Sequence, residues 1–224
     1  MGIQLIFMFL FEQFNLFKLV GFETDTIFKS SKFKNFYELF LKINFMNLNI
    51  FDGTITALIT PFSKGEIDFA LLESLIDRQI ESGINGIVIG GSTGEGSSIA
   101  GDQHFELVKA ASEYAGNKVN IFAGITAIST NEALIKLEKL SSLDIDGVMC
   151  TAPQYIKPEQ EGLFQHFKSI HDATNVPLML YIHPGRTACD FSDDTIFRIM
   201  ELERFVAIKD ATSDLEKPLR ILSK

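Results

Sequence analysis

A lysine that ends a short apolar segment, Phe205–Lys209, is the clearest candidate for covalent chemistry in this chain. The segment is too short for a helix and consists of β-branched and apolar residues, so it is predicted to be a buried strand. Partial loss of hydration at the strand end lowers the pKa of Lys209, and the free amine is then a nucleophile for carbonyl groups. A side chain that turns into water or pairs with Asp210 is the alternative interpretation.

A glycine-rich segment, Gly91–Gly96, supplies a second candidate site. Glycines allow backbone N–H groups to approach an anion, and Ser92 and Thr93 add hydroxyl donors. The segment lacks both the Gly-Lys-Ser/Thr sequence of a P-loop and the glycine spacing of a dinucleotide-binding motif. It therefore suits a carboxylate or a phosphate, with a simple turn as the alternative.

Apolar, strand-like segments recur about every 30 residues, which is the length of one strand–helix unit. Helical spacing of apolar residues lies between them, for example from Ile67 to Ile80, and Asn131 and Ser192 mark candidate helix starts. The alternation indicates an α/β fold with a parallel sheet, either doubly wound or closed into a barrel. The predicted strands are Thr54–Thr60, Gly86–Gly90, Asn120–Gly124, Asp146–Thr151, Pro177–Tyr181 and Phe205–Lys209.

Polar side chains follow nearly every predicted strand. A doubly wound sheet concentrates its site at one switch point, whereas a (β/α)₈ barrel uses the carboxyl ends of all its strands. The sequence therefore predicts a TIM barrel, of which about six βα units are present in this chain. The strand-end residues are Thr60, Ser92, Thr93, Thr126, Thr151, Tyr155, Tyr181, Arg186 and Lys209.

Several motifs in register resemble one family, that of 4-hydroxy-tetrahydrodipicolinate synthase, also called dihydrodipicolinate synthase. This family belongs to the pyruvate-dependent class I aldolases, a superfamily of (β/α)₈ barrels. The resemblance runs from about Ile50 to the last residue. Its motifs are Gly91-Ser92-Thr93-Gly94-Glu95, Tyr155, Tyr181-x-x-Pro184-x-Arg186-Thr187 and Ile208-Lys209-Asp210-Ala211-Thr212.

The resemblance implies an aldol condensation of pyruvate with aspartate-4-semialdehyde, which gives 4-hydroxy-tetrahydrodipicolinate in the diaminopimelate route to lysine. Lys209 would form a Schiff base with pyruvate, and the resulting enamine would attack the aldehyde. Tyr181 would relay protons beside the imine. Ser92 would link Tyr181 to Tyr155, which would reach in from a neighbouring subunit and so implies a homo-oligomer, either a dimer or a tetramer.

The resemblance also implies two substrate-binding residues. Thr93 would hold the pyruvate carboxylate, and Arg186 would bind the carboxylate of the aldehyde substrate with its planar fork of donors. Each aromatic or charged residue has a structural alternative: packing for Tyr181, a subunit contact for Tyr155 and an exposed loop cation for Arg186.

The chain departs from the family pattern near the predicted site. Ser92 stands where the family usually has threonine, and its hydroxyl can make the same hydrogen bonds. Gln154 replaces a tyrosine of the subunit contact, which allows a different interface. Ile182 and His183 replace the usual Asn-Val after Tyr181, which allows a different loop position but removes no reactive group.

N-acetylneuraminate lyase and other 2-keto-acid aldolases of the superfamily would share Lys209, Tyr181 and the Ser-Thr loop. Arg186 after Pro184 favours the dipicolinate-forming enzyme, because a cation there suits a short dicarboxylate better than a sugar chain. An inactive remnant of the family is a further alternative. A barrel needs eight strands to close, and only six units are visible before Lys224, so the chain is expected to be truncated.

Residues 1–49 are predicted to be a Phe-rich extension outside the fold, and residues 50–224 an incomplete TIM-barrel catalytic domain. The extension holds 11 of the 21 phenylalanines. Met46 precedes the point where the family usually begins, so it is predicted to be the real start, with a membrane-associating or organelle-targeting extension as the alternative. The apolar run at residues 2–11 is too short to span a bilayer.

Composition favours a cytoplasmic protein with small-molecule substrates. The net charge of −9 argues against partners such as nucleic acid or an anionic membrane. The two cysteines and four histidines lack metal-ligand spacing. Neither a metal nor a cofactor is expected, because in the implied chemistry the protonated imine is the electron sink.

Overall fold

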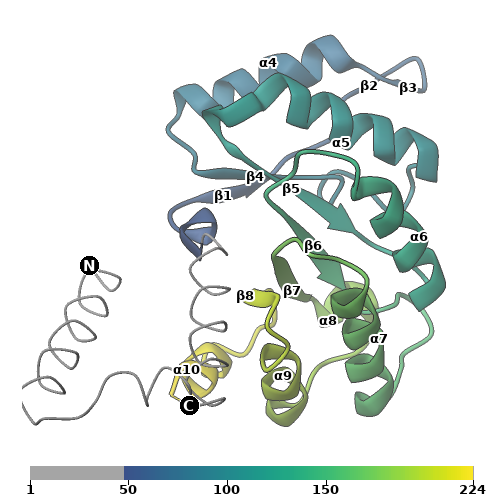
Figure 1. Ribbon diagram of the computed structural model, residues 1–224, viewed down its shortest axis with the longest axis vertical. Coiled ribbons are helices and arrows are strands. Elements are labelled where there is room, and N and C mark those ends of the chain that lie inside the picture. Colours follow the sequence, from purple (N-terminus) through teal and green to yellow (C-terminus); the bar gives the residue numbers. More distant parts are fainter. Residues whose placement is uncertain (1–47, 224) are drawn as a thin grey trace, which may run out of the picture. The chain divides into compact units, whose positions relative to one another are not determined.

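The computed structural model of the chain describes residues 48–223, and a six-stranded parallel sheet forms its centre (Figure 1). Neighbours in the sheet follow the order of the chain. Each predicted strand is confirmed, with ends that differ by up to three residues. The strands are β1 (Ile55–Ala57), β4 (Gly86–Ile89), β5 (Asn120–Ile125), β6 (Gly147–Thr151), β7 (Leu178–Ile182) and β8 (Phe205–Asp210).

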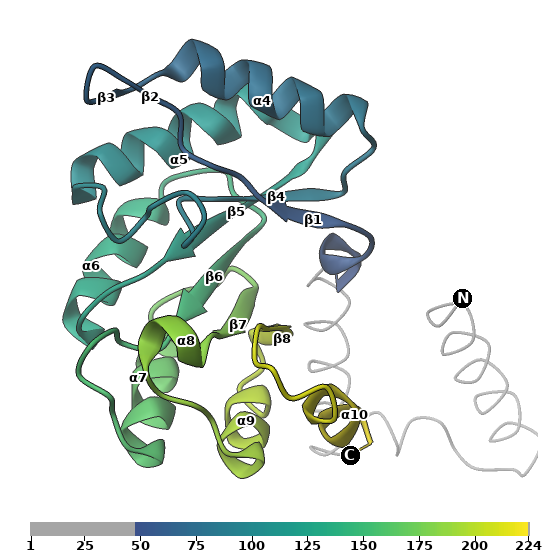
Figure 2. The ribbon, with the colours of Figure 1, turned by 180° about the vertical axis from the view of Figure 1, so that it is seen from behind.

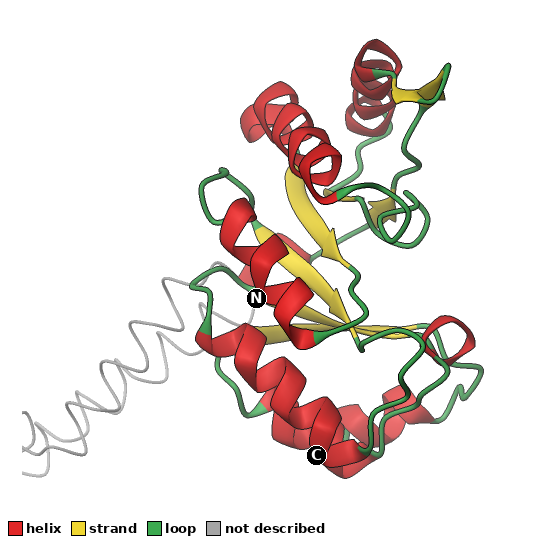
Figure 3. Cartoon of the chain, turned by 90° about the vertical axis from the view of Figure 1, so that its right-hand side faces the viewer, coloured by secondary structure: helices red, strands yellow, loops and turns green. Residues whose placement is uncertain are grey.

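Helices connect successive strands and cover the outer face of the curled sheet (Figures 2 and 3). A doubly wound sheet would reverse its strand order and carry helices on both faces. The arrangement is instead that of six consecutive units of a (β/α)₈ barrel, as predicted. The helices are α4 (Phe69–Glu81), α5 (Gly101–Ala115), α6 (Thr130–Leu140), α7 (Gln160–Asp172), α8 (Pro184–Thr187), α9 (Asp193–Met200) and α10 (Lys217–Leu222), with 3₁₀ turns η1 (Leu48–Phe51) and η2 (Gly116–Lys118).

The predicted placement of Ile67 in a helix was wrong. Ile67 lies in β3 (Glu66–Ile67), which pairs with β2 (Phe62–Ser63) in a hairpin. The two residues between these strands, Lys64 and Gly65, both have positive φ, as a tight hairpin turn requires. Helix α4 begins only after Asp68, whose carboxylate accepts a hydrogen bond from the Leu71 N–H.

Serine caps begin two further helices. Ser192 accepts a hydrogen bond from the Thr195 N–H, which confirms the predicted start of α9. Ser129 does the same for the Glu132 N–H, so α6 begins at Thr130, one residue before the predicted start. In both cases the serine oxygen satisfies an N–H group that has no partner within the helix.

Side chains alternate between the two faces of each strand and so divide the core. In β4, Ile87 and Ile89 lie under the helices, whereas Val88 lies on the inner face of the curled sheet. The inner cluster consists of Ile50, Val88, Phe122, Met149, Met179 and Tyr181. The inner face is therefore apolar below the strand ends, where the predicted site residues begin.

Phe122 fills the inner face because two neighbouring strands carry glycine beside it. A Cβ atom on Gly86 would lie 2.6 Å from the ring, and one on Gly147 would lie 3.2 Å from it. The Phe51 ring stacks on Phe122 at a centroid distance of 4.9 Å. The Asn120 amide donates a hydrogen bond of 3.1 Å to the Ile50 carbonyl. These contacts close the amino end of the inner face.

Strand β8 is less buried than predicted. Phe205 is buried, but residues 206–210 are only partly buried. Within the described residues β8 has a single neighbour, β7, so its outer edge is not covered by another strand. The prediction of a buried strand therefore holds for Phe205 and is wrong for the rest of the segment.

The Phe-rich extension predicted for residues 1–49 lies outside the described residues, apart from the last two, so the division of the chain at that point stays a prediction. Among residues 48–223, no helix combines the length and apolar character needed to cross a membrane.

His166 joins three elements at the carboxyl end of the sheet. Its Nδ1 atom lies 2.9 Å from the Thr130 hydroxyl at the start of α6, and its Nε2 atom lies 3.3 Å from the Thr151 carbonyl at the end of β6. The side chain is buried within α7, and burial lowers its pKa to about 4.

We expect stability to fall as pH is lowered from about 6.5 towards 4, because the unfolded chain then binds a proton at this imidazole that the folded chain excludes. With an unfolded pKa of 6.5 and a folded pKa of about 4, the loss is on the order of 3 kcal/mol once pH reaches 4. Urea unfolding of the wild type and of His166→Gln between pH 7.5 and 4.5 measures this loss of stability. The difference in unfolding free energy between the two proteins should shrink at acid pH, and parallel curves would contradict the assignment.

Candidate active site

Lys209 and Tyr181 lie side by side at the carboxyl end of the sheet. They are register partners in β8 and β7, and the Lys209 Nζ atom lies 4.3 Å from the centroid of the Tyr181 ring. Lys209 is partly buried, and this loss of hydration lowers its pKa, as the sequence predicted. Within the described residues it forms no ion pair with Asp210, which was one form of the alternative interpretation.

A bulge in β8 brings Lys209 to the inner face. Leu178 pairs with Phe205, but the next residue of β7, Met179, pairs with Ala207, which leaves Val206 as an extra residue. Phe205 faces the helices, whereas Ala207 packs on the inner cluster. Because side chains alternate after this point, Lys209 follows Ala207 onto the inner face.

Tyr181 is the buried centre of the candidate site. It is 5% exposed, and burial raises its pKa. A hydrogen bond with the Ser92 side chain and the positive charge of Arg186 act in the opposite direction. The structure thus brings three of the predicted residues, Ser92, Arg186 and Lys209, around one phenol group.

Close backbone packing holds the loop that carries Ser92. A Cβ atom on Gly96 would lie 1.7 Å from the Gly90 carbonyl oxygen, and one on Gly124 of β5 would lie 2.6 Å from the Gly91 backbone. The Thr60 hydroxyl donates a hydrogen bond of 2.7 Å to the Gly94 carbonyl from the segment after β1. Only glycine permits these approaches, so the loop has little freedom to move Ser92 away from Tyr181.

Thr93 follows Ser92 in this loop, and its side chain is exposed. It lies at the predicted position beside the strand ends. None of its side-chain hydrogen bonds or ion pairs joins it to Tyr181 or Lys209 within the described residues. Its predicted contact with a carboxylate therefore stays a prediction.

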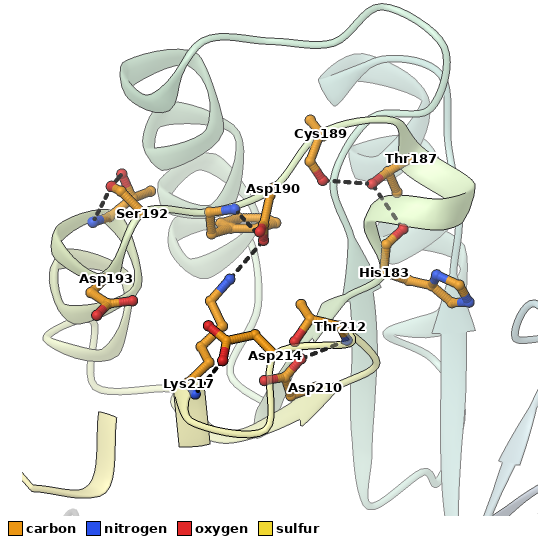
Figure 4. A network of polar contacts seen from close by, with 12 residues as sticks. His183, Thr187, Cys189, Asp190, Ser192, Asp193, Asp210, Thr212, Asp214 and Lys217 are labelled. Carbon is orange, nitrogen blue, oxygen red and sulfur yellow. Dashed lines mark hydrogen bonds and ion pairs between the residues drawn. The ribbon is translucent and has the colours of Figure 1, made fainter. Parts of the chain in front are cut away.

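Arg186 lies on α8, a single helical turn where the sequence predicted only a loop. Its N–H group donates a hydrogen bond of 2.9 Å to the His183 carbonyl. The buried Thr187 hydroxyl contacts the His183 and Cys189 carbonyls at 3.1 and 3.2 Å (Figure 4). This turn fixes the backbone, while the guanidinium remains exposed.

Within the described residues, Tyr155 makes no hydrogen bond with the Tyr181 phenol. It is 89% exposed, with a φ of 71°, and it follows a loop tied down by a 3.0 Å hydrogen bond from the Gln154 N–H to the Ala127 carbonyl. Its predicted partner, another subunit, stays a prediction. The residues Gln154, Tyr155, Lys157, Arg186 and Ala188 line an open pocket of about 670 Å³.

A polar network that the sequence did not predict holds the segment after Lys209 (Figure 4). The Lys217 ammonium is buried and lies 2.7 Å from the Asp190 carboxylate, in the segment between α8 and α9. Arg220 forms ion pairs with Asp193 and Asp214 at 2.9 and 3.0 Å. No spacing signal in the sequence links Lys217 to Asp190 or Arg220 to Asp193, because the two members of each pair come from different βα units.

A second feature missed from the sequence is a group of buried polar atoms without partners among the described residues. They are Thr126 Oγ1, Thr151 Oγ1, His183 Nδ1, Asp210 Oδ2 and Thr212 Oγ1. All lie at or just after the carboxyl ends of strands, and their position at strand ends was the one signal that could have found them. In residues 48–223, no cluster of three or more histidine, cysteine or acidic side chains is arranged to hold a metal.

Comparisons with known proteins identify the family of the chain. The model of the dihydrodipicolinate synthetase family matches residues 50–224. The 4-hydroxy-tetrahydrodipicolinate synthase of Rickettsia bellii is 42% identical over 175 residues, which cover 78% of this chain and 60% of the relative. The chain thus spans about 60% of the length of such relatives.

Solved structures of the family have the same fold. The chloride-inhibited dihydrodipicolinate synthase from Acinetobacter baumannii, in complex with pyruvate, is 40% identical and has a TM-score of 0.74 over 76% of this chain and 59% of that one. The enzyme from Aquifex aeolicus is 33% identical, with a TM-score of 0.75 over 77% and 59% of the two chains. The family model covers most of the chain, and the structures share its barrel fold. The chain therefore belongs to the dihydrodipicolinate synthetase family.

Proposed function

We propose that the protein is a lyase that condenses pyruvate with aspartate-4-semialdehyde through a Schiff base on Lys209, in the diaminopimelate route to lysine. The observation that carries this proposal is the partly dehydrated Lys209 amine, 4.3 Å from the centre of the Tyr181 ring at the end of a barrel strand. The relatives named above support the choice of substrates.

The first step is attack of the Lys209 amine on the keto carbon of pyruvate. Loss of water then gives a protonated imine, which withdraws electrons and allows the methyl group to lose a proton. The resulting enamine carbon attacks the aldehyde carbon, and the new alkoxide takes up a proton. The substrate amine then closes the ring on the imine carbon and releases Lys209, so the amine is regenerated.

Tyr181 is suited to the proton transfers. Its raised pKa keeps the phenol protonated near neutral pH, so it can donate to a leaving hydroxyl or to the alkoxide. Ser92 hydrogen bonds to it and provides the next link of a relay. We assign the far end of this relay to Tyr155 from a second subunit, which makes the active species a dimer or a tetramer.

Two residues of the strand-end loops bind the substrate carboxylates. Thr93 and the neighbouring backbone N–H groups take the carboxylate of pyruvate. Arg186 takes the carboxylate of the aldehyde, for which its exposed, planar guanidinium is suited. In this proposal residues 50–224 carry the catalytic domain, and the reaction takes place in the cytoplasm, without nucleic-acid or membrane partners.

N-acetylneuraminate lyase and other 2-keto-acid aldolases are not favoured, because the relatives at about 40% identity are 4-hydroxy-tetrahydrodipicolinate synthases. The competing hypothesis is that the chain keeps the family's residues but does not catalyse the reaction. It predicts that the Lys209 amine does not react with pyruvate.

We expect pyruvate and borohydride to add one reduced pyruvate to the intact chain, because borohydride converts the imine into a stable amine. Peptide mass spectrometry should locate the adduct on Lys209. Lys209→Arg keeps the charge but removes the nucleophile, so it should give no adduct. A chain that stays unmodified, or an adduct retained in Lys209→Arg, would refute the proposal.

Replacing Tyr181 by Phe keeps the ring beside Lys209 but removes the hydroxyl. We expect the rate of imine formation to fall by about 100-fold, which is within the range of general acid catalysis. Borohydride trapping at early times measures this rate. Ser92→Ala should give a smaller decrease, because it removes only the hydrogen bond to the phenol. Thermal unfolding is the control, and a normal trapping rate in a folded Tyr181→Phe protein would remove Tyr181 from the mechanism.

A further inference from the structure

His183 shares the inner side of the strand end with the candidate site. It follows Tyr181 by two residues, and the residue between them, Ile182, is fully buried on the outer face. The alternation of side chains returns His183 to the side of Tyr181. Its ring lies 5.7 Å from the Tyr181 ring, at an interplanar angle of 68°.

The backbone of His183 is fixed by the same turn that carries Arg186. Its carbonyl accepts hydrogen bonds from the Arg186 and Thr187 N–H groups and from the Thr187 hydroxyl. His183 is the N-cap residue of α8 and Arg186 is the third residue of this turn, and both lie near Tyr181. Figure 4 shows the imidazole turned away from the network of Asp190 and Lys217.

One nitrogen of this imidazole lacks a partner. Nδ1 is buried and has no hydrogen bond within the described residues, although the side chain as a whole is partly exposed. The ring lies close to Gly185, where an added Cβ atom would be 3.3 Å from Cε1 and 3.5 Å from Nδ1. A buried polar atom without a partner is destabilising, so an apolar side chain would be the better choice if packing were its only role.

We propose that His183 is a substrate-binding residue, which together with Arg186 holds the carboxylate of the aldehyde substrate. This inference rests on the proposed function. An imidazole N–H donates to one carboxylate oxygen, while the guanidinium binds the other. The edge-on contact with Tyr181 fixes the plane of the ring, and the substrate supplies the partner that the free protein lacks.

The pair also predicts specificity. Two donors on one turn favour an aldehyde that carries a carboxylate over a neutral aldehyde of similar length. A proton relay through His183 is a different role, and the structure does not support it: the contact with Tyr181 is one of ring packing, and no hydrogen bond joins the two side chains within the described residues.

The test uses the full chain after pyruvate has been trapped on Lys209 with borohydride, because this adduct fills the pyruvate site but cannot react further. The trapped chain, with ¹³C-labelled histidine, is titrated with aspartate-4-semialdehyde and, separately, with butanal. The imidazole signal of His183 is assigned by its loss in His183→Asn. The same titrations are made with His183→Val, which removes the donor, and with His183→Asn, which keeps one near Nδ1.

We expect the His183 signal to shift with aspartate-4-semialdehyde and not with butanal. His183→Val should weaken binding of aspartate-4-semialdehyde by about tenfold or more, the usual effect of losing a hydrogen bond to a charged group, and His183→Asn should restore part of it. Mass spectrometry measures the fraction of each protein that carries trapped pyruvate, and the affinities are compared for that fraction. An unshifted signal, or unchanged affinity in His183→Val, would overturn the role of His183 while the proposed function stands. Failure to trap pyruvate in wild type would overturn both.

Discussion

The pairing of β7 with β8 is the constraint on which the candidate site depends. Side chains of a strand alternate between faces, so a register slip of one residue would send Lys209 under the helices and Ile208 to the inner face. Burial of Phe205 against the outer core and of Ala207 on the inner cluster prevents such a slip. The bulge at Val206 allows Phe205 to pack on the outer face and Ala207 on the inner face of the same strand. The position of the amine is thus set by apolar packing several residues away.

Backbone contacts of glycines fix the position of Ser92 on the other side of Tyr181. Ser92 is placed by a loop in which Gly96 and Gly124 lie against backbone atoms at distances that any side chain would block. The position of the Ser92 hydroxyl beside Tyr181 is thus set by backbone packing in the loop that carries it.

Buried polar contacts hold the loops around this centre, and loss of one partner in such a contact would lower the stability of the fold. The Lys217 side chain is 4% exposed, whereas that of its ion-pair partner Asp190 is 56% exposed. Loss of the Asp190 carboxylate would leave a buried charge without a partner, which is strongly destabilising. His166 acts similarly between two helices and β6, where protonation would break a buried contact. These contacts specify where the loops lie rather than how tightly the core packs.

The sequence by itself determined the order of six strands and the helices between them, because apolar periodicity is a local property of the chain. It also determined which strand ends carry reactive groups, and it predicted the lowered pKa of Lys209. Only the tertiary structure decided which face Lys209 takes, because strict alternation from the buried Phe205 would place it on the outer face and the bulge reverses this. It alone revealed the unpaired imidazole of His183, since the burial of an atom and the lack of a partner depend on segments far apart in the chain.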